Sequence, residues 1–117
     1  MKVVIAGGRT FDNYSFLKEK CDEILKDIVD VEIVSGTAKG ADKLGEQYSI
    51  EKGYGLKQFP ADWGKFGKSA GIRRNEQMAD YGDMLIAFWD GKSKGTKHMI
   101  DYSNKKKLKV HVVRYSS

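Results

Sequence analysis

The sequence predicts an α/β protein: a mostly parallel sheet of five strands between two layers of helices. Short apolar runs rich in β-branched residues alternate along the chain with stretches of helical character, which is the pattern of repeated β-α-β units. Glycine-bearing loops follow the strands. The 117 residues suffice for one domain with a core of its own.

Five strands are expected. Four of them are continuous apolar runs, typical of buried parallel strands: 3–6, 31–34, 84–89 and 110–113. The fifth candidate, 55–59, carries Lys57 and Gln58, so we place it at the edge of the sheet.

Four helices are expected between the strands. Asp12 or Asn13 can cap the first. In the second, Ala41, Leu44 and Tyr48 form an inward stripe. The expected ranges are 16–28, 41–48, about 69–80 and about 95–106.

The alternation of elements also predicts the topology. Right-handed crossovers give a three-layer α/β/α sandwich. With the strand order 3-2-1-4-5, the first and fourth strands lie together at the switch point, where open α/β sheets form a ligand crevice. The architecture is therefore Rossmann-like, with residues 7–9 beside residues 90–96.

Composition narrows the class of protein. Hydrophobic residues make up 40% and charged residues 32%, which is ordinary for a soluble globular protein. The single cysteine, Cys21, lies on the apolar face of the first helix and is expected to be a buried, inert thiol, which fits a reducing cytoplasm. No leader and no apolar run approaching about 18 residues is seen, so we expect a cytoplasmic protein without a membrane partner.

Four glycine-bearing loops should gather at the carboxyl edge of the sheet: 6–9, 35–40, 61–64 and 90–96. Glycine lets backbone N–H groups approach a phosphate, and a helix N-terminus adds partial positive charge. Neither a Walker loop nor the dinucleotide fingerprint is present, and no metal or cofactor is expected. The predicted ligand-binding residues are Gly7, Gly8, Arg9, Ser35, Gly36, Thr37, Lys39, Gly40, Asp62, Trp63, Arg74, Asn75, Asp90, Gly91, Ser93, Lys94, Gly95 and Thr96.

Particular side chains suggest roles within this set. Asp62 can accept from ribose hydroxyls or a base amine, and Trp63 offers a stacking face, although core burial is the commoner fate of a tryptophan. Arg73 and Arg74 point in different directions on a helix, so at most one should face the crevice. The pKa of a histidine suits proton transfer, but a lone histidine such as His98 is more often structural.

The net charge of +5 is unevenly placed, with seven lysines crowded into the last quarter of the chain. We interpret the run 105–107 as a solvated helix C-terminus that faces the negative end of the helix dipole. The alternatives are a nucleic-acid surface or, near Lys92 and Lys94, an anionic ligand.

The segments 6–11, 35–42, 59–63, 70–75 and 88–96 together closely resemble the YspA-type branch of the SLOG superfamily, over nearly the whole chain. The superfamily takes its name from the Smf/DprA and Lonely Guy proteins. The resemblance implies a Rossmann-like fold that binds nucleotides or nucleotide-derived molecules. Residues 1–117 would then be a single SLOG-like nucleotide-ligand-binding domain, expected to form a homodimer or higher homo-oligomer.

The Lonely Guy enzymes of this superfamily cleave the N-glycosidic bond of nucleoside monophosphates with an arginine and a glutamate. Arg74 matches the family arginine and Thr96 the family threonine, but His98 stands at the glutamate position. Since a carboxylate normally stabilises an oxocarbenium-like transition state, hydrolysis needs a substitute such as Asp62 or Asp90. The candidate catalytic set is Arg74, His98 and Asp62.

The first functional prediction is a sensor or sequestering module for a nucleoside phosphate or an ADP-ribose-like molecule. The alternative is a phosphoribohydrolase-like N-glycosidase that acts on nucleoside monophosphates. DprA-like nucleic-acid binding is the weaker alternative, because the aromatic residues do not interleave with the C-terminal lysines.

Overall fold

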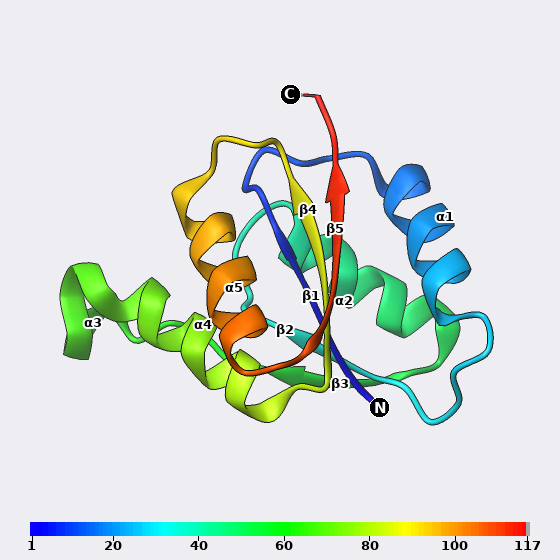
Figure 1. Ribbon diagram of the computed structural model, residues 1–117, viewed down its shortest axis with the longest axis horizontal. Helices are drawn as coiled ribbons and strands as arrows, with labels where there is room; N and C mark the ends of the chain where they lie inside the picture. Colours follow the sequence, from blue (N-terminus) through cyan, green and yellow to red (C-terminus); the bar gives the residue numbers. More distant parts are fainter. Residues whose placement is uncertain (117) are drawn as a thin grey trace.

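The computed structural model describes residues 1–116, and there it contains a five-stranded parallel sheet in the order β3-β2-β1-β4-β5 (Figure 1). Each neighbouring pair of strands is parallel, which confirms the predicted fold class and strand order. The strands are β1 (Lys2–Gly7), β2 (Glu32–Ser35), β3 (Gly55–Gln58), β4 (Met84–Trp89) and β5 (Lys109–Arg114).

Helices cover both faces of this sheet (Figure 1). Side chains alternate along β1, so that Val3 and Ile5 pack with the first helical layer while Val4 and Ala6 pack with the second. The first layer holds α1 (Tyr14–Leu25) and α2 (Ala41–Lys52), and the second holds α4 (Ala70–Tyr81) and α5 (Lys94–Lys105). The short α3 (Trp63–Phe66) and the 3-10 helix η1 (Gly67–Ser69) extend away from the sheet at the left of Figure 1.

Several helices begin or end at other residues than expected, because their capping residues set these boundaries. Helix α1 begins after Asn13, whose side chain accepts from the Phe16 N–H at 3.1 Å, and it ends at Leu25. Helix α2 runs to Lys52, where Gly53 adopts the left-handed conformation that closes a helix (φ 71°). Helix α5 starts at Lys94, one residue before the expected start, because Ser93 is its N-cap.

The register places β1 at the switch point. Val3 pairs with Ile33 on one side and with Met84 on the other, and Gly7 lies opposite Phe88. Strand β3 forms an exposed edge, as predicted. The loops after β1, β2 and β4 therefore meet at one edge of the sheet.

Cys21 is fully buried on α1, and burial raises the pKa of its thiol to about 12. The thiol is therefore protonated at neutral pH, as expected for a structural cysteine. Within residues 1–116, the helices are too short or too polar to span a bilayer.

Candidate functional site

The end of β1 is held against α2 and β4 by two glycines. A side chain at Gly7 would collide with the Phe88 carbonyl oxygen and would lie 2.9 Å from the Ala41 Cβ. The Gly8 N–H donates to the Phe88 carbonyl, and the Gly8 carbonyl accepts from the Ala41 N–H, both at 3.2 Å. These contacts fix the N-terminus of α2 beside the end of β1.

Around this point, the first turns of α2, α4 and α5 surround two adjoining hollows of about 240 and 370 Å³, which we call the cleft. Both hollows are lined by Arg9, Ala38, Trp63 and Arg74. Helix N-termini carry partial positive charge, so three of them around one space favour an anion. Of the described residues that line the cleft, Asp42 is the one acid, against Arg9, Lys39, Lys68 and Arg74.

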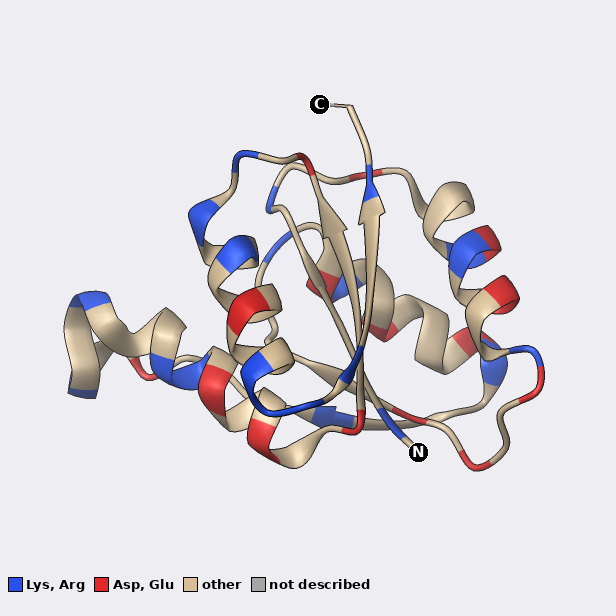
Figure 2. Ribbon diagram, in the orientation of Figure 1, with Lys and Arg blue, Asp and Glu red and all other residues tan. Residues whose placement is uncertain are grey.

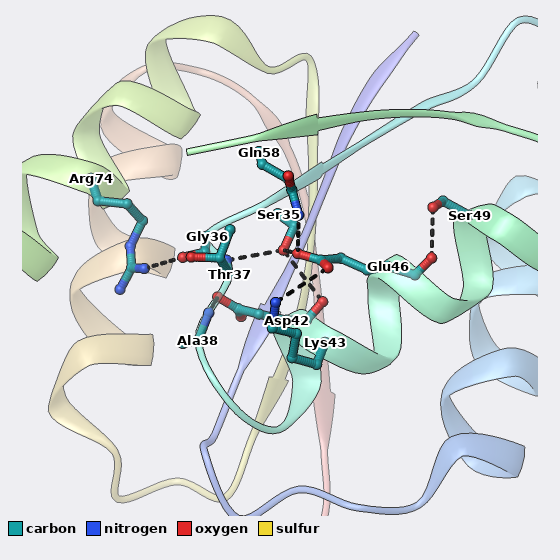
Figure 3. Close-up of polar contacts among 10 residues, drawn as sticks. All are labelled: Ser35, Gly36, Thr37, Ala38, Asp42, Lys43, Glu46, Ser49, Gln58 and Arg74. Carbon is teal, nitrogen blue, oxygen red and sulfur yellow. Dashed lines mark hydrogen bonds and ion pairs between the residues drawn. The ribbon is translucent and has the colours of Figure 1, made fainter. Parts of the chain in front are cut away.

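Arg74 is fixed within the cleft by two hydrogen bonds. Its Nη1 donates to the Gly36 carbonyl at 2.5 Å (Figure 3). Its Nε donates to Asn75 Oδ1 at 3.0 Å. Burial lowers the pKa of the guanidinium, and the Asp42 carboxylate opposes that shift. Arg74 is thus a positioned cation with N–H groups left for a ligand.

Asp42 lies in the first turn of α2 and is only 4% exposed. Its Oδ2 accepts from the Ala38 N–H at 3.3 Å. Burial raises the pKa of this carboxyl to about 6, although Arg74 acts in the opposite direction. Asp42 was not predicted as a site residue. The signal in the sequence was an acid in the first turn of the helix that follows a glycine-bearing loop.

The loop after β2 is held from behind by a hydrogen-bond network. Ser35 Oγ donates to Glu46 Oε2 at 2.7 Å and accepts from the Thr37 N–H at 3.0 Å (Figure 3). Gln58 Nε2 donates to the same Glu46 oxygen at 3.1 Å. Thr37 has a positive φ of 65°, which is uncommon for a threonine, so the network maintains an unfavourable backbone conformation.

The loop after β4 is shaped by Asp90. Its Oδ1 accepts from the N–H groups of Lys92 at 2.8 Å and Ser93 at 2.9 Å, and these bonds lower the pKa of the carboxyl. Ser93 Oγ then accepts from the Thr96 N–H at 3.3 Å as the cap of α5. Asp90 therefore orders the turn, whereas Ser93 and Thr96 line the cleft.

Two predicted side chains lie at α3. Asp62 is exposed, and its Oδ1 caps this helix by accepting from the Lys65 N–H at 3.0 Å. Trp63 is 51% exposed at the rim of the cleft, so it does not belong to the core.

The arginine pair diverges as expected. Arg74 enters the cleft, while Arg73 is exposed and stacks on the Phe66 ring at 4.5 Å. His98 lies outside the described lining, with Nε2 3.9 Å from Glu76 Oε2 and Nδ1 3.5 Å from Asn75 Nδ2.

The structure thus divides the predicted binding residues into two groups. Those that line the cleft are Gly7, Arg9, Gly36, Thr37, Lys39, Trp63, Arg74, Asn75, Ser93, Gly95 and Thr96. Those outside its described lining are Gly8, Ser35, Gly40, Asp62, Asp90, Gly91 and Lys94. Several of the second group shape the loops of the first, as Ser35 and Asp90 do.

A larger hollow of about 750 Å³ lies on the other side of the β1–α1 loop. Its lining includes Phe11, Phe16 and Tyr115, with Arg114 and Asp12 as charges of opposite sign. It therefore lacks the excess of cations that marks the cleft. Among residues 1–116, no three His, Cys, Asp or Glu side chains come together as a metal site.

The C-terminal lysines separate into two sets at the two ends of α5 (Figure 2). Lys94 and Lys97 lie at its start, near the carboxyl edge of the sheet. Lys105 and Lys106 lie at its C-terminal end, and Lys106 Nζ is 3.3 Å from Asp80 Oδ1. This position agrees with a solvated helix C-terminus.

Comparison with known proteins supports the family assignment suggested by these features. The family model of the YspA, cpYpsA-related SLOG family matches residues 1–66. The Gene 61 protein of Mycobacterium phage D29 is 30% identical over 120 residues, with 93% of either chain covered. A structure of DNA processing protein A from Helicobacter pylori, described for its single-stranded DNA binding mode, superposes with a TM-score of 0.71 at 18% identity, covering 98% of this chain and 66% of that one.

Proposed function

Since the chain belongs to the YspA, cpYpsA-related SLOG family, we propose that it binds a nucleotide-derived small molecule in the cleft, as a sensor or a sequestering protein. The ligand class is a nucleoside phosphate or an ADP-ribose-like molecule. The observation that carries this proposal is the placement of Arg74 and Arg9 between three helix N-termini, above the glycine backbone of the loops after β1 and β2.

The phosphate is assigned to the space beside Arg74, Gly36 and the first turn of α5. Guanidinium and backbone N–H groups both suit phosphate oxygens. Trp63 at the rim offers a face on which a base can stack, because half of its surface is free. The ligand would then extend from the switch point towards α3.

The direct test is to identify what the protein carries. Protein purified under native conditions is denatured, and the released small molecules are analysed by mass spectrometry. Calorimetric titration with AMP and with ADP-ribose follows. Saturable binding of either compound supports the proposal. The absence of both a released nucleotide and any binding contradicts it.

Gly95→Val tests the position of the ligand without disturbing the protein around it. A Cβ at Gly95 would meet nothing within 4 Å, so the valine projects into the open cleft. We expect binding to weaken roughly tenfold or more through lost backbone and charged contacts, while helix propensity changes stability by less than about 1 kcal/mol. Affinity is measured by calorimetry and stability by thermal unfolding.

The matched control is Gly55→Val, since Gly55 begins the edge strand β3 outside the cleft and a Cβ there meets Glu32 Cγ at 3.6 Å. It should leave affinity unchanged. Gly36→Val is a less clean test, because its Cβ would lie 2.8 Å from both Arg74 and Asp42 and would displace them. A folded Gly95→Val protein with native affinity would place the ligand elsewhere.

A second candidate function is N-glycosidase activity on nucleoside monophosphates. The observation that favours it is a buried carboxyl, Asp42, beside Arg74 in the cleft. We nevertheless expect no free base when the protein is incubated with purine and pyrimidine nucleoside monophosphates, because His98 and Asp62 lie outside the described lining. Chromatography measures this. Robust base release that is lost in Asp42→Asn would favour the enzyme, with Asp42 as its carboxyl group.

Single-stranded nucleic acid is a third candidate ligand. Helix α3 and η1 place the aromatic Trp63 and Phe66 among Lys65, Lys68 and Arg73, beside the cleft. Stacking faces among cations are typical of single-strand binding. Binding of single-stranded DNA that falls steeply with salt, without small-molecule binding, would favour this function.

A further inference from the structure

The carboxylate of Asp42 has few hydrogen-bond partners for a group so deeply buried. An ionised carboxylate offers about four acceptor positions. Among the described residues, this one receives only the Ala38 N–H, at 3.3 Å. Ser35 Oγ approaches the backbone carbonyl of Asp42 and donates its short bond to Glu46 instead. Burial without partners disfavours a charged group, so added donors would stabilise it.

Arg74 lies next to this carboxylate without pairing to it. Arg74 Nη1 and Asp42 Oδ2 each lie 2.8 Å from the point where a Gly36 side chain would begin. The guanidinium donates to the Gly36 carbonyl and to Asn75, and the described ion pairs do not include Asp42. A cation and an acceptor therefore lie close together beside Gly36, and both line the cleft.

We infer that Asp42 is a specificity-determining residue of the cleft, whose carboxylate accepts a hydrogen bond from an O–H group that the ligand carries beside its anionic oxygens. The inference rests on the proposed function, because Arg74 must hold those oxygens. Two groups have the required chemistry: a sugar hydroxyl of a ribose phosphate, and the remaining O–H of a protonated phosphate. Asp62, which was expected to accept from ribose, caps α3 instead.

An anion without such a donor is disfavoured twice at this position. It supplies no donor to the carboxylate, and its charge faces a second negative charge across a short gap. The cleft should therefore distinguish between anions of equal charge and similar shape by the presence of the O–H group alone.

The first arm of the test compares inorganic phosphate with sulfate at pH 8, where both are mainly dianions and only phosphate retains an O–H group. Affinities are measured by competition against a bound nucleotide. The native protein should prefer phosphate by roughly tenfold or more, the size of one hydrogen bond to a charged group. In Asp42→Asn the ratio of the affinities for phosphate and sulfate should fall close to one, because the amide can also donate a hydrogen bond to sulfate.

The second arm compares ribose 5-phosphate with methyl phosphate at the same pH, where only the sugar supplies O–H groups. A preference for ribose 5-phosphate that disappears in Asp42→Asn identifies the sugar as the donor, and a loss confined to the first arm identifies the phosphate. The matched control is Asp62→Asn, which keeps a good N-cap and lies outside the described lining. It should change neither preference.

The outcomes separate this inference from the proposed function. If the anions bind but the native protein shows no preference in either arm, the role of Asp42 is wrong and the anion site stands. The preference of the native protein is the ratio of two measured affinities in each arm. It tests the role of Asp42 even if the Asp42→Asn protein does not fold. If none of the four anions competes with the nucleotide, the anion site is wrong and the role of Asp42 falls with it.

Discussion

Replacement of Arg74 by alanine is expected to weaken the binding of ADP-ribose roughly ten- to hundredfold, since hydrogen bonds to charged groups contribute about 1.5 to 3 kcal/mol. Arg74 is already held by Gly36 and Asn75, so little entropy is lost when a phosphate joins it. Arg74→Lys should recover only part of the loss, because a lysine lacks the planar fork that suits phosphate oxygens. Calorimetric titration of the three proteins measures these differences.

Arg73→Ala provides the matched control for this prediction. The Arg73 guanidinium stacks on Phe66, and its Nε donates to Ser69 Oγ at 3.2 Å. Removal of the Arg73 side chain should therefore affect contacts with these two residues but not the contacts with the phosphate. Affinity for ADP-ribose should stay within about twofold of the native value, as is usual for a surface change outside a site. A damaging Arg73→Ala together with a silent Arg74→Ala would show that the phosphate lies on the other side of α4.

Asp42→Asn is expected to be more stable than the native protein at pH 7.5, by on the order of 2 to 3 kcal/mol. The pKa of Asp42 is raised to about 6 in the folded protein, from a value of 3.8 for a free carboxyl. Between these two values the unfolded chain releases its proton while the folded protein retains it. The native protein therefore loses stability as pH rises from about 4 to about 6, and Asp42→Asn does not share that loss.

The measurement is a urea unfolding series from pH 4 to pH 8 on both proteins. The difference in the free energy of unfolding should be smallest at pH 4, grow towards pH 6 and remain level above it. Asp22, whose pKa is lowered chiefly by its hydrogen bond from Tyr48, is present in both proteins and cancels in the difference. A difference that does not change with pH would mean that Asp42 titrates normally.

These two predictions concern two neighbouring side chains of the cleft, Arg74 and Asp42. Arg74 should contribute to binding, whereas the buried Asp42 costs stability and should contribute to selectivity. Binding sites commonly retain residues that destabilise the fold, because their partners arrive with the ligand.

The fold was predictable because its pattern is strong. Continuous apolar runs at 3–6 and 84–89 identified the buried central strands, and Lys57 identified the edge strand. Helix ends were less predictable, since they depend on single capping contacts such as Ser93 with Thr96. Helix α3 escaped prediction because four residues contain too little periodicity to detect.

The location of the candidate site could be predicted better than the side chains that line it. Glycine loops after parallel strands indicated the edge of the sheet, and the topology brought those loops together. The direction of individual side chains depended on local hydrogen bonds. Asp62 caps α3, and Asp90 accepts hydrogen bonds from its own loop. Asp42 lies inward, because its position on α2 faces Arg74. Sequence spacing alone does not distinguish these three aspartates.

The pairing of β1 with strands on both of its sides has a consequence for how the chain acquires its structure. One edge of β1 can pair as soon as Ile33 has been synthesised, but its other edge has no partner until Met84 is available. Such distant pairings slow folding, because a long segment must be closed before they form. Until then a growing chain exposes an apolar strand edge, which can recruit a strand from another chain. Nascent chains of this protein are therefore expected to be vulnerable to aggregation until β4 has been synthesised.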